Sequence, residues 1–159
     1  MIISFINRIK CNNHEYLEIR DYLIKNRRYS KKVQEKNKSF LIIVLDIYRI
    51  YLEEINSYNG IDFDLMISES IKVVLEKGMY RKYKYIIIDE FQDTSMVRYQ
   101  LIKEIREKTN AKIMCVGDDY QSIYAFSGCN LDLFVNFKKY FFNSKVLFIN
   151  KTYRNCYEL

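Results

Sequence analysis

The sequence contains no proline and no tryptophan, and it has only four glycines among 159 residues. It also lacks a run of roughly 18 apolar residues, which is the length that a membrane-spanning helix requires. The apolar runs at 40–45 and 86–88 end at Asp46 and Asp89. We therefore expect a protein without a membrane span.

Two further features are missing. The N-terminus, MIISFINRIKC, has no basic region ahead of its apolar stretch and no small-residue cleavage site, so we predict a cytoplasmic protein without a secretory signal. Its four cysteines include no CxxC pair, which favours reduced thiols over a zinc site or a disulfide framework. A hydrophobic content of 49% is enough to form the core of one domain, or of one domain plus a subdomain.

Positive charge is concentrated in the first half of the chain. The net charge is +6, and residues 1–84 carry 16 basic and 11 acidic residues, against 10 and 9 in residues 85–159. Most of the excess comes from seven residues: Lys25, Arg27, Arg28, Lys31, Lys32, Lys36 and Lys38. This run is either a solvated surface or a patch that follows the phosphates of a nucleic acid.

The first half has helical periodicity. Between Ser39 and Asn59, apolar residues recur at helical spacing, and we expect one face to hold Phe40, Ile43, Val44, Ile47, Ile50 and Tyr51. A second helix is predicted to begin at Asp62 as its N-cap and to end at Gly78. Residues 1–84 are therefore predicted to form a helical, basic subdomain.

The second half alternates between strands and helices. Strands are predicted at 85–88, 112–116 and 145–149, with one helix capped by Thr94 or Ser95 and another by Asn130. This βαβαβ order predicts an α/β fold with a parallel sheet in residues 85–159, and such sheets bind ligands at the carboxyl ends of their strands.

Polar clusters follow each predicted strand. Asp89 and Glu90 end the first strand, where one carboxylate can hold hydrated Mg²⁺ and the next can accept a proton from an attacking water. Acids at strand ends are also common as helix caps or surface groups, so this pair alone does not decide between the two roles.

The segments IIIDEFQDTS, VGDDYQSIYAFSG and KTYRN together resemble three ordered motifs of the UvrD/Rep type of superfamily 1 DNA helicases. The resemblance is greatest to the helicase IV branch, because of the LF..F pattern at 133–137 and the segment IDFDLMI at 61–67. It implies a partial RecA-like motor domain, the cofactors ATP and Mg²⁺, and 3′ to 5′ movement on single-stranded DNA.

The resemblance also implies roles for individual residues. Asp89 would hold Mg²⁺, Glu90 would activate water, and Gln121 would contact the terminal phosphate, where an amide can both donate and accept hydrogen bonds. The alternative for Gln121 is a hydrogen bond that tethers the loop. Arg154 would be the arginine finger, and Tyr153 would stack on adenine. The alternatives are a surface group for Arg154 and core packing for Tyr153. Gln92, Asp93 and Asp118 are expected to support the site.

Two aromatic residues of the middle motif are candidates for stacking on DNA bases. Tyr124 and Phe126 lie two residues apart, so in an extended backbone they face the same way. The alternative is that they fill the core beneath the loop. Ser127 stands where many relatives carry arginine, which removes one candidate phosphate contact and agrees with the helicase IV branch.

The sequence has no GxxxxGK[ST] phosphate loop. We therefore expect an internal piece of a helicase that hydrolyses ATP poorly or not at all by itself. Its expected partners are single-stranded DNA, the remainder of the helicase and, through apolar surface left uncovered, a second copy of the chain. One alternative is a non-enzymatic module that binds single-stranded nucleic acid or a protein partner. A metal nuclease is disfavoured because no third acid or lysine stands at a suggestive spacing.

Overall fold

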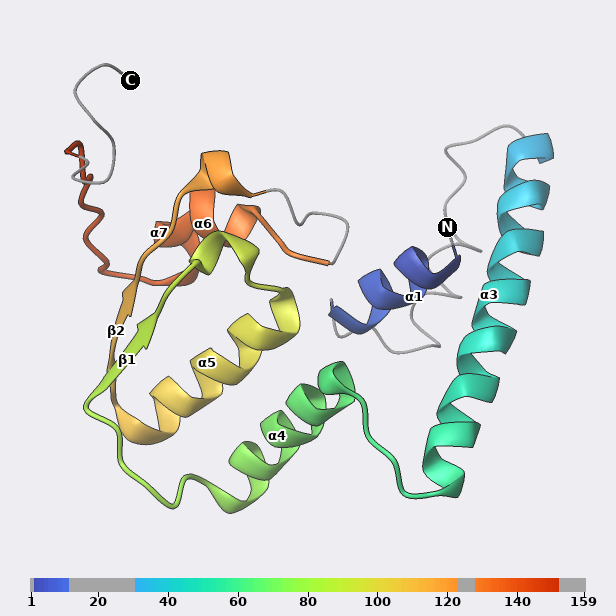
Figure 1. The fold of residues 1–159 in the computed structure, drawn as a ribbon, viewed down its shortest axis with the longest axis horizontal. Helices are drawn as coiled ribbons and strands as arrows, with labels where there is room; N and C mark the ends of the chain where they lie inside the picture. The colour runs from blue at the N-terminus through green and yellow to red at the C-terminus, as the bar shows by residue number, and fades with distance from the viewer. Residues whose placement is uncertain (1, 12–30, 123–127, 152–159) are drawn as a thin grey trace.

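The computed structural model describes residues 2–11, 31–122 and 128–151 (Figure 1). The helices are α1 (Ile2–Cys11), α3 (Lys31–Ser57), α4 (Phe63–Lys77), α5 (Met96–Thr109), α6 (Asp132–Val135) and α7 (Phe137–Tyr140), the strands are β1 (Tyr85–Ile88) and β2 (Lys112–Cys115), and the short 3₁₀ helices are η1 (Phe91–Asp93) and η2 (Asp119–Gln121). In this part of the chain, none of the helices has the length and apolarity needed to cross a membrane.

The centre of the second half is a β1–α5–β2 unit. The two strands are parallel and in register, with Tyr85 opposite Lys112 and Ile88 opposite Cys115. The connecting helix α5 begins at the predicted cap Ser95, whose side chain accepts a hydrogen bond from the amide of Arg98, and it ends at Asn110 in the left-handed conformation. The structure confirms the first two predicted strands and the helix between them.

The predicted third strand at 145–149 is wrong. These residues adopt no regular secondary structure, and Leu147 is 87% exposed. A parallel strand needs a hydrogen-bonded neighbour and cover on both faces. In the described ranges, the sheet consists of β1 and β2 only. Over the described residues the order is therefore βαβ instead of the predicted βαβαβ.

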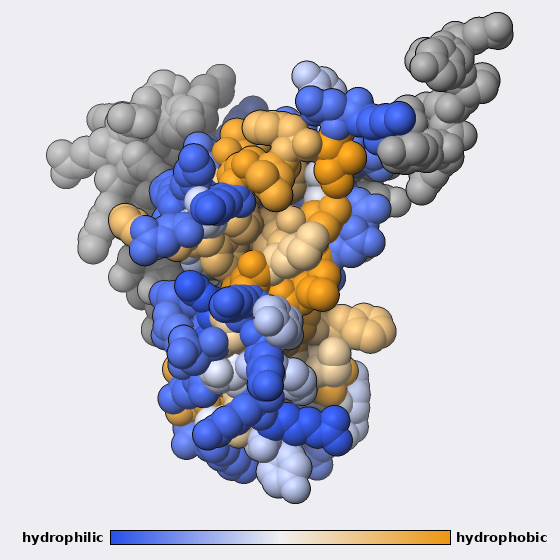
Figure 2. Space-filling model, turned by 90° about the vertical axis from the view of Figure 1, so that its left-hand side faces the viewer, coloured by the Kyte–Doolittle hydropathy of each residue, from blue (hydrophilic) through white to orange (hydrophobic). Residues whose placement is uncertain are grey.

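The sheet is covered on one face. The side chains of Ile88, Ile113 and Cys115 pack against a core built around Phe91 and Leu133. On the other face, Ile87 and Met114 are opposite each other and are 72% and 59% exposed. The view in Figure 2, from the left-hand side of Figure 1, shows a broad apolar area bordered by hydrophilic residues.

The helix expected after Asn130 is broken into two short pieces. Asn130 acts partly as predicted, because its side-chain oxygen accepts a hydrogen bond from the amide of Asp132. However, Asn136 separates α6 from α7 with a non-helical backbone. This break lets Leu133 and Phe141 both enter the core around Phe91.

A second core lies where α1 meets α3. Ile9 of α1 packs against Leu45 and Tyr48 of α3. The predicted apolar face of α3 is only partly correct, because Val44 is buried whereas three predicted members, Ile43, Ile47 and Ile50, are exposed. Helix α3 is apolar on more than one face, and the side that contacts α1 is the one that becomes buried.

Helix α4 begins and ends as the sequence predicts. The carboxylate of Asp62 accepts a hydrogen bond from the amide of Leu65 at 2.8 Å, and Gly78 closes the helix with a positive φ. Helix α4 then lies along α5 (Figure 1), where Lys108 donates a hydrogen bond to the carbonyl of Leu75. The first half of the chain is thereby attached to the βαβ unit.

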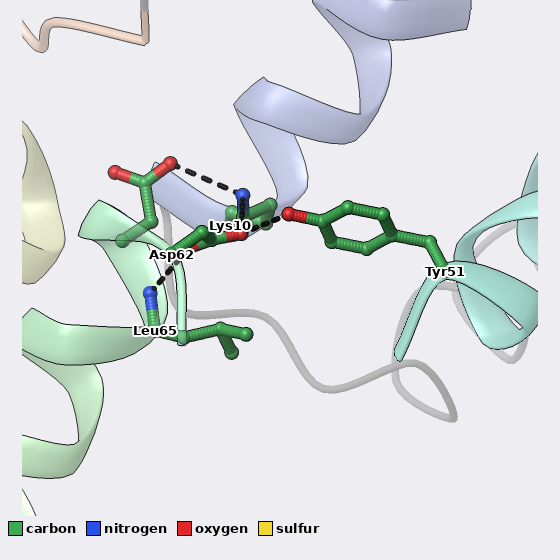
Figure 3. Close-up of polar contacts among 5 residues, drawn as sticks. Lys10, Tyr51, Asp62 and Leu65 are labelled. Atoms are coloured by element: carbon green, nitrogen blue, oxygen red, sulfur yellow. Dashed lines mark hydrogen bonds and ion pairs between the residues drawn. The ribbon is translucent and has the colours of Figure 1, made fainter. Parts of the chain in front are cut away.

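The cap of α4 also joins three helices (Figure 3). Lys10 of α1 forms an ion pair with Asp62 at 2.5 Å, and the hydroxyl of Tyr51 of α3 donates to the same carboxylate. Burial alone would raise the pKa of Asp62, but the bonds from Leu65, Lys10 and Tyr51 outweigh it and lower that pKa below 3.8. The ionised form of Asp62 therefore stabilises the folded chain.

This cluster predicts how stability depends on pH. Because the folded pKa of Asp62 is depressed, its contribution is present above a pH of about 3.8 and is lost as the pH falls through the folded pKa. We expect Asp62→Ala to lower the free energy of unfolding at neutral pH by about 1 kcal/mol through loss of the helix cap. The free energy of unfolding should fall further because Lys10 loses an ion-pair partner.

Asp62→Asn is the matched control, because asparagine is also a good N-cap but carries no charge. Chemical denaturation at several pH values should show that Asp62→Asn keeps the cap contribution and loses the acid dependence. Equal losses of stability in the two variants would contradict the assignment of the cap.

Candidate active site

Strand β1 ends in two exposed carboxylates. One oxygen of Asp89, Oδ1, accepts a hydrogen bond from the amide of Glu90 at 3.0 Å, which fixes the turn after the strand. Among the described residues, the other oxygen, Oδ2, makes no hydrogen bond or ion pair. Asp89 can therefore offer Oδ2 to a ligand without breaking a contact in the described structure.

Glu90 has an uncommon backbone conformation. Four described non-glycine residues have positive φ, and three of them are asparagines, which tolerate this region well. Glu90, with φ 50° and ψ 44°, is the fourth. Such a conformation costs on the order of 1–3 kcal/mol and persists only where neighbouring contacts enforce it. The contacts that enforce it come from the two residues that follow.

Phe91 anchors the turn in the core. Its side chain is fully buried, and its ring packs edge-on against Phe137. Its amide donates to the carbonyl of Val116 at 2.9 Å, and the amide of Val116 donates to Ile88. These two bonds extend the β1–β2 pairing beyond the strand ends and hold the acidic turn beside the loop that follows β2.

Gln92 connects that turn to the loop through its side chain. The amide is 1% exposed, its Nε2 donates to Glu90 Oε2 at 2.7 Å, and its Oε1 accepts from the amide of Asp118 at 3.0 Å. A hydrogen bond to a charged group contributes roughly 1.5–3 kcal/mol, and a buried amide left without partners costs a similar amount. The buried bridge therefore helps to offset the strain at Glu90.

The loop after β2 carries Gln121, which is connected to the acidic turn through Asp118. The carboxylate of Asp118 accepts from the amide of Tyr120 at 3.0 Å and from the side-chain Nε2 of Gln121 at 2.9 Å. Gln121 is exposed, so its amide is held at one end and accessible at the surface. A continuous path of contacts thus joins Glu90, Gln92, Asp118 and Gln121.

The far end of the same loop is also attached to the acidic turn. The thiol of Cys129 donates to the carbonyl of Asp93 at 2.9 Å, and the amide of Asn130 donates to the carbonyl of Thr94 at 3.0 Å. The side-chain oxygen Asp93 Oδ1 is buried and has no hydrogen-bond partner in the described structure. The segment 117–130 therefore begins and ends against residues 89–94.

The structure brings together six of the predicted site residues: Asp89, Glu90, Gln92, Asp93, Asp118 and Gln121. The other four, Tyr124, Phe126, Tyr153 and Arg154, lie outside the described residues. Lys25, Arg27 and Arg28 of the basic run also lie outside them, whereas Lys36 and Lys38 are exposed on α3.

The role of Gly117 is not predicted from the sequence. A Cβ atom at this position would lie 2.4 Å from Gln92 Oε1, 2.8 Å from the ring of Phe134 and 3.2 Å from the amide nitrogen of Phe91. Only glycine leaves space for the amide bridge. The available signal was a glycine directly after a strand, which often marks a close approach of another group.

The oxygen ligands at the end of β1 suit Mg²⁺. This cation prefers carboxylate oxygens, keeps several waters, and is commonly held by one or two carboxylates together with substrate phosphates. In the described part of the chain there is no cluster of three or more residues of the types His, Cys, Asp and Glu that could hold a metal by themselves. The exposed Asp89 fits the arrangement in which phosphates complete the coordination.

The close approach at Gly117 leads to a test by substitution. We expect Gly117→Ala to lower the free energy of unfolding by roughly 1–3 kcal/mol, because the new methyl group meets a buried amide, a ring and a backbone amide. Gly60→Ala is the control: its Cβ would also lie 2.4 Å from a neighbour, but that neighbour is the exposed ring of Tyr58, which can move away, and the backbone contact that remains, with the carbonyl oxygen of Ile55, is at 3.3 Å. Thermal denaturation would compare them, and an equal effect of both substitutions would contradict the packing at Gly117.

The chain is similar in sequence to known helicases. The model of the UvrD/REP helicase N-terminal domain matches residues 1–142. The ATP-dependent DNA helicase PcrA of Bacillus subtilis is 34% identical over 119 residues, which are 71% of this chain and 16% of the relative. DNA helicase IV of Escherichia coli is 38% identical over 98 residues, or 60% of this chain and 14% of the relative.

The ATP-dependent DNA helicase Rep of Buchnera aphidicola is 33% identical over 113 residues, which cover 68% of this chain and 17% of the relative. The chain therefore spans about one sixth of the length of these curated relatives. The family match covers both the helical first half and the βαβ unit with its acidic turn, so the chain belongs to the UvrD/Rep helicase N-terminal domain family.

Proposed function

We propose that this chain forms part of the ATPase motor of a DNA helicase that moves 3′ to 5′ along single-stranded DNA. The observation that carries the proposal is the linked pair of strand ends, where Asp89 and Glu90 follow β1 and Gln121 follows β2. In parallel α/β sheets, ligands bind outside the carboxyl ends of the strands. The names of the relatives, which are ATP-dependent DNA helicases, support the same proposal.

Each residue has a role in this proposal. Asp89 would hold Mg²⁺, and the bound cation would neutralise charge on the phosphates. Glu90 accepts the proton of the attacking water, and its carboxylate accepts a hydrogen bond from the amide of Gln92. Gln121 contacts the terminal phosphate. Arg154 would act as the arginine finger and Tyr153 would stack on adenine.

DNA contacts belong to the loop that starts and ends against the acidic turn. Tyr124 and Phe126 lie within the segment 117–130, whose two ends are bonded to Gln92 and to residues 93–94. A change in the acidic turn can therefore reach residues that stack on bases. The division of the chain into a helical, basic part at 1–84 and an ATPase part at 85–159 belongs to the same proposal.

We propose that the isolated chain binds Mg²⁺–ATP weakly and hydrolyses it poorly or not at all, because the sequence has no phosphate loop to bind the β and γ phosphates. Titration of the ¹⁵N-labelled chain with Mg²⁺–ATP should shift the amide resonances of Glu90 and Gln121. Asp89→Asn should remove the Mg²⁺ dependence of these shifts, and Asp119→Asn, a nearby exposed acid, should leave it intact.

Phosphate release in the presence of single-stranded DNA tests the low activity. Robust turnover that is abolished by Glu90→Gln would contradict the claim that the isolated chain is inactive. Resonances unmoved by nucleotide, together with salt-dependent binding of single-stranded DNA that Phe126→Ala weakens, would favour the alternative of a non-enzymatic nucleic-acid-binding module.

We further propose that the chain self-associates through the uncovered face of the sheet, where Ile87 and Met114 are exposed side by side. Apolar surface of this kind is usually covered by another element or another chain. Ile87→Lys should weaken association by about tenfold or more, since a charge then enters the contact. Ile43→Lys, on the exposed side of α3, is the control, and a strictly monomeric wild-type chain in concentrated light-scattering samples would contradict the proposal.

A further inference from the structure

We propose that Gln92 is a positioning residue that orients the carboxylate of Glu90 and ties its position to the loop that carries Gln121. This inference rests on the proposed function of Glu90 and Gln121, and it adds a physical connection between them. The connection is the buried amide of Gln92, which bonds to Glu90 on one side and to the backbone of Asp118 on the other.

The chemistry of the partners fixes the direction of this bridge. The carboxylate of Glu90 can only accept hydrogen bonds, and the backbone amide of Asp118 can only donate one. The amide of Gln92 must therefore present its NH₂ group to Glu90 and its oxygen to Asp118, as the structure shows. Glutamate could serve Asp118 but would repel Glu90, and methionine could serve neither.

Burial makes the bridge obligatory. The side chain of Gln92 is 1% exposed, so water is not at hand to replace a lost partner. Gly117 leaves room for its oxygen, since any Cβ there would lie 2.4 Å from Oε1. Gln92 therefore cannot move away from Asp118 without breaking a buried bond.

The next contact carries the connection to Gln121. The carboxylate of Asp118, whose backbone amide is bonded to Gln92, accepts the side-chain amide of Gln121 at 2.9 Å. A displacement of Gln121 by a phosphate would act on Asp118, then on Gln92 and then on Glu90. The same path runs in reverse, because such coupling between two sites is reciprocal.

The test is a double-mutant cycle read by NMR in the absence of nucleotide. Glu90→Ala should shift the backbone amide of Asp118 and the side-chain amide of Gln121 in the otherwise wild-type chain. In the Gln92→Met background, the same substitution should produce shifts at least about threefold smaller. Gln92→Met should also speed hydrogen exchange of the Asp118 amide by about tenfold, because its acceptor is removed.

Gln92→Glu separates positioning from packing. It keeps an acceptor for Asp118 but repels Glu90, so exchange of the Asp118 amide should stay close to wild type, while the response of Gln121 to Glu90→Ala should differ from that of the wild-type chain. If Gln92 only packed in the core, its replacement would lower stability, and the response of Gln121 to Glu90→Ala would not depend on the residue at position 92. Equal responses to Glu90→Ala in all three backgrounds would overturn the proposal.

Two further measurements keep the proposal testable. If the Gln92 variants do not fold, Glu90→Gln alone should move the side-chain NH₂ resonances of Gln92, because a bond to a charged acceptor becomes a bond to a neutral one. Unmoved resonances would overturn the assignment. Addition of Mg²⁺–ATP separates the bridge from the proposed function. If Glu90 and Gln121 are coupled but neither responds to nucleotide, the bridge stands and the proposed function fails. If they respond to nucleotide but are not coupled, the proposed function stands and the bridge fails.

Discussion

The structure around the acidic turn depends on one buried amide. Gln92 is the point at which the end of β1 and the loop after β2 are held together by side-chain hydrogen bonds. Because the side chain of Gln92 is buried, the loss of either bond would leave part of its amide group without a partner. The positive φ of Glu90, the complete burial of Phe91 and the glycine at position 117 all accommodate this bridge.

A few hydrogen bonds join the acidic turn to the segment 117–130. The acidic turn contacts both ends of the segment 117–130, through Asp118 at its start and through Cys129 and Asn130 at its end. Both described ends of this segment are therefore bonded to one turn. In a motor, this geometry would allow a change at the nucleotide to reach the residues proposed to stack on DNA.

The sequence predicts the local elements of this fold well, because their signals are local. Asp62 and Ser95 cap their helices as expected, Gly78 and Asn110 end them, and the strands at 85–88 and 112–115 form. The predicted site residues at the strand ends also lie together where the structure describes them. Both strands are followed by polar residues that can be recognised in the sequence. Because a parallel sheet places the carboxyl ends of its strands at one edge, these residues are expected to lie close together.

The errors concern partners that no local pattern specifies. Residues 145–149 are apolar enough for a strand, but a strand forms only against a neighbour. Ile43 and Ile47 continue a helical stripe, yet α1 packs against a different side of α3. The bridge through Gln92 and the tight contact at Gly117 depend on two segments meeting in space, so they could be recognised only once the β1–β2 register was known.

The most direct test of the account replaces Mg²⁺ with Mn²⁺, whose unpaired electrons broaden NMR signals of nearby nuclei. If the two strand ends form one site, substoichiometric Mn²⁺ added together with ATP should broaden the amides of Asp89 and Glu90 together with those of Asp118 and Gln121, and Asp89→Asn should abolish the effect at all four. Broadening centred on Asp62 and Asp64, or spread evenly over the acidic surface, would contradict the account.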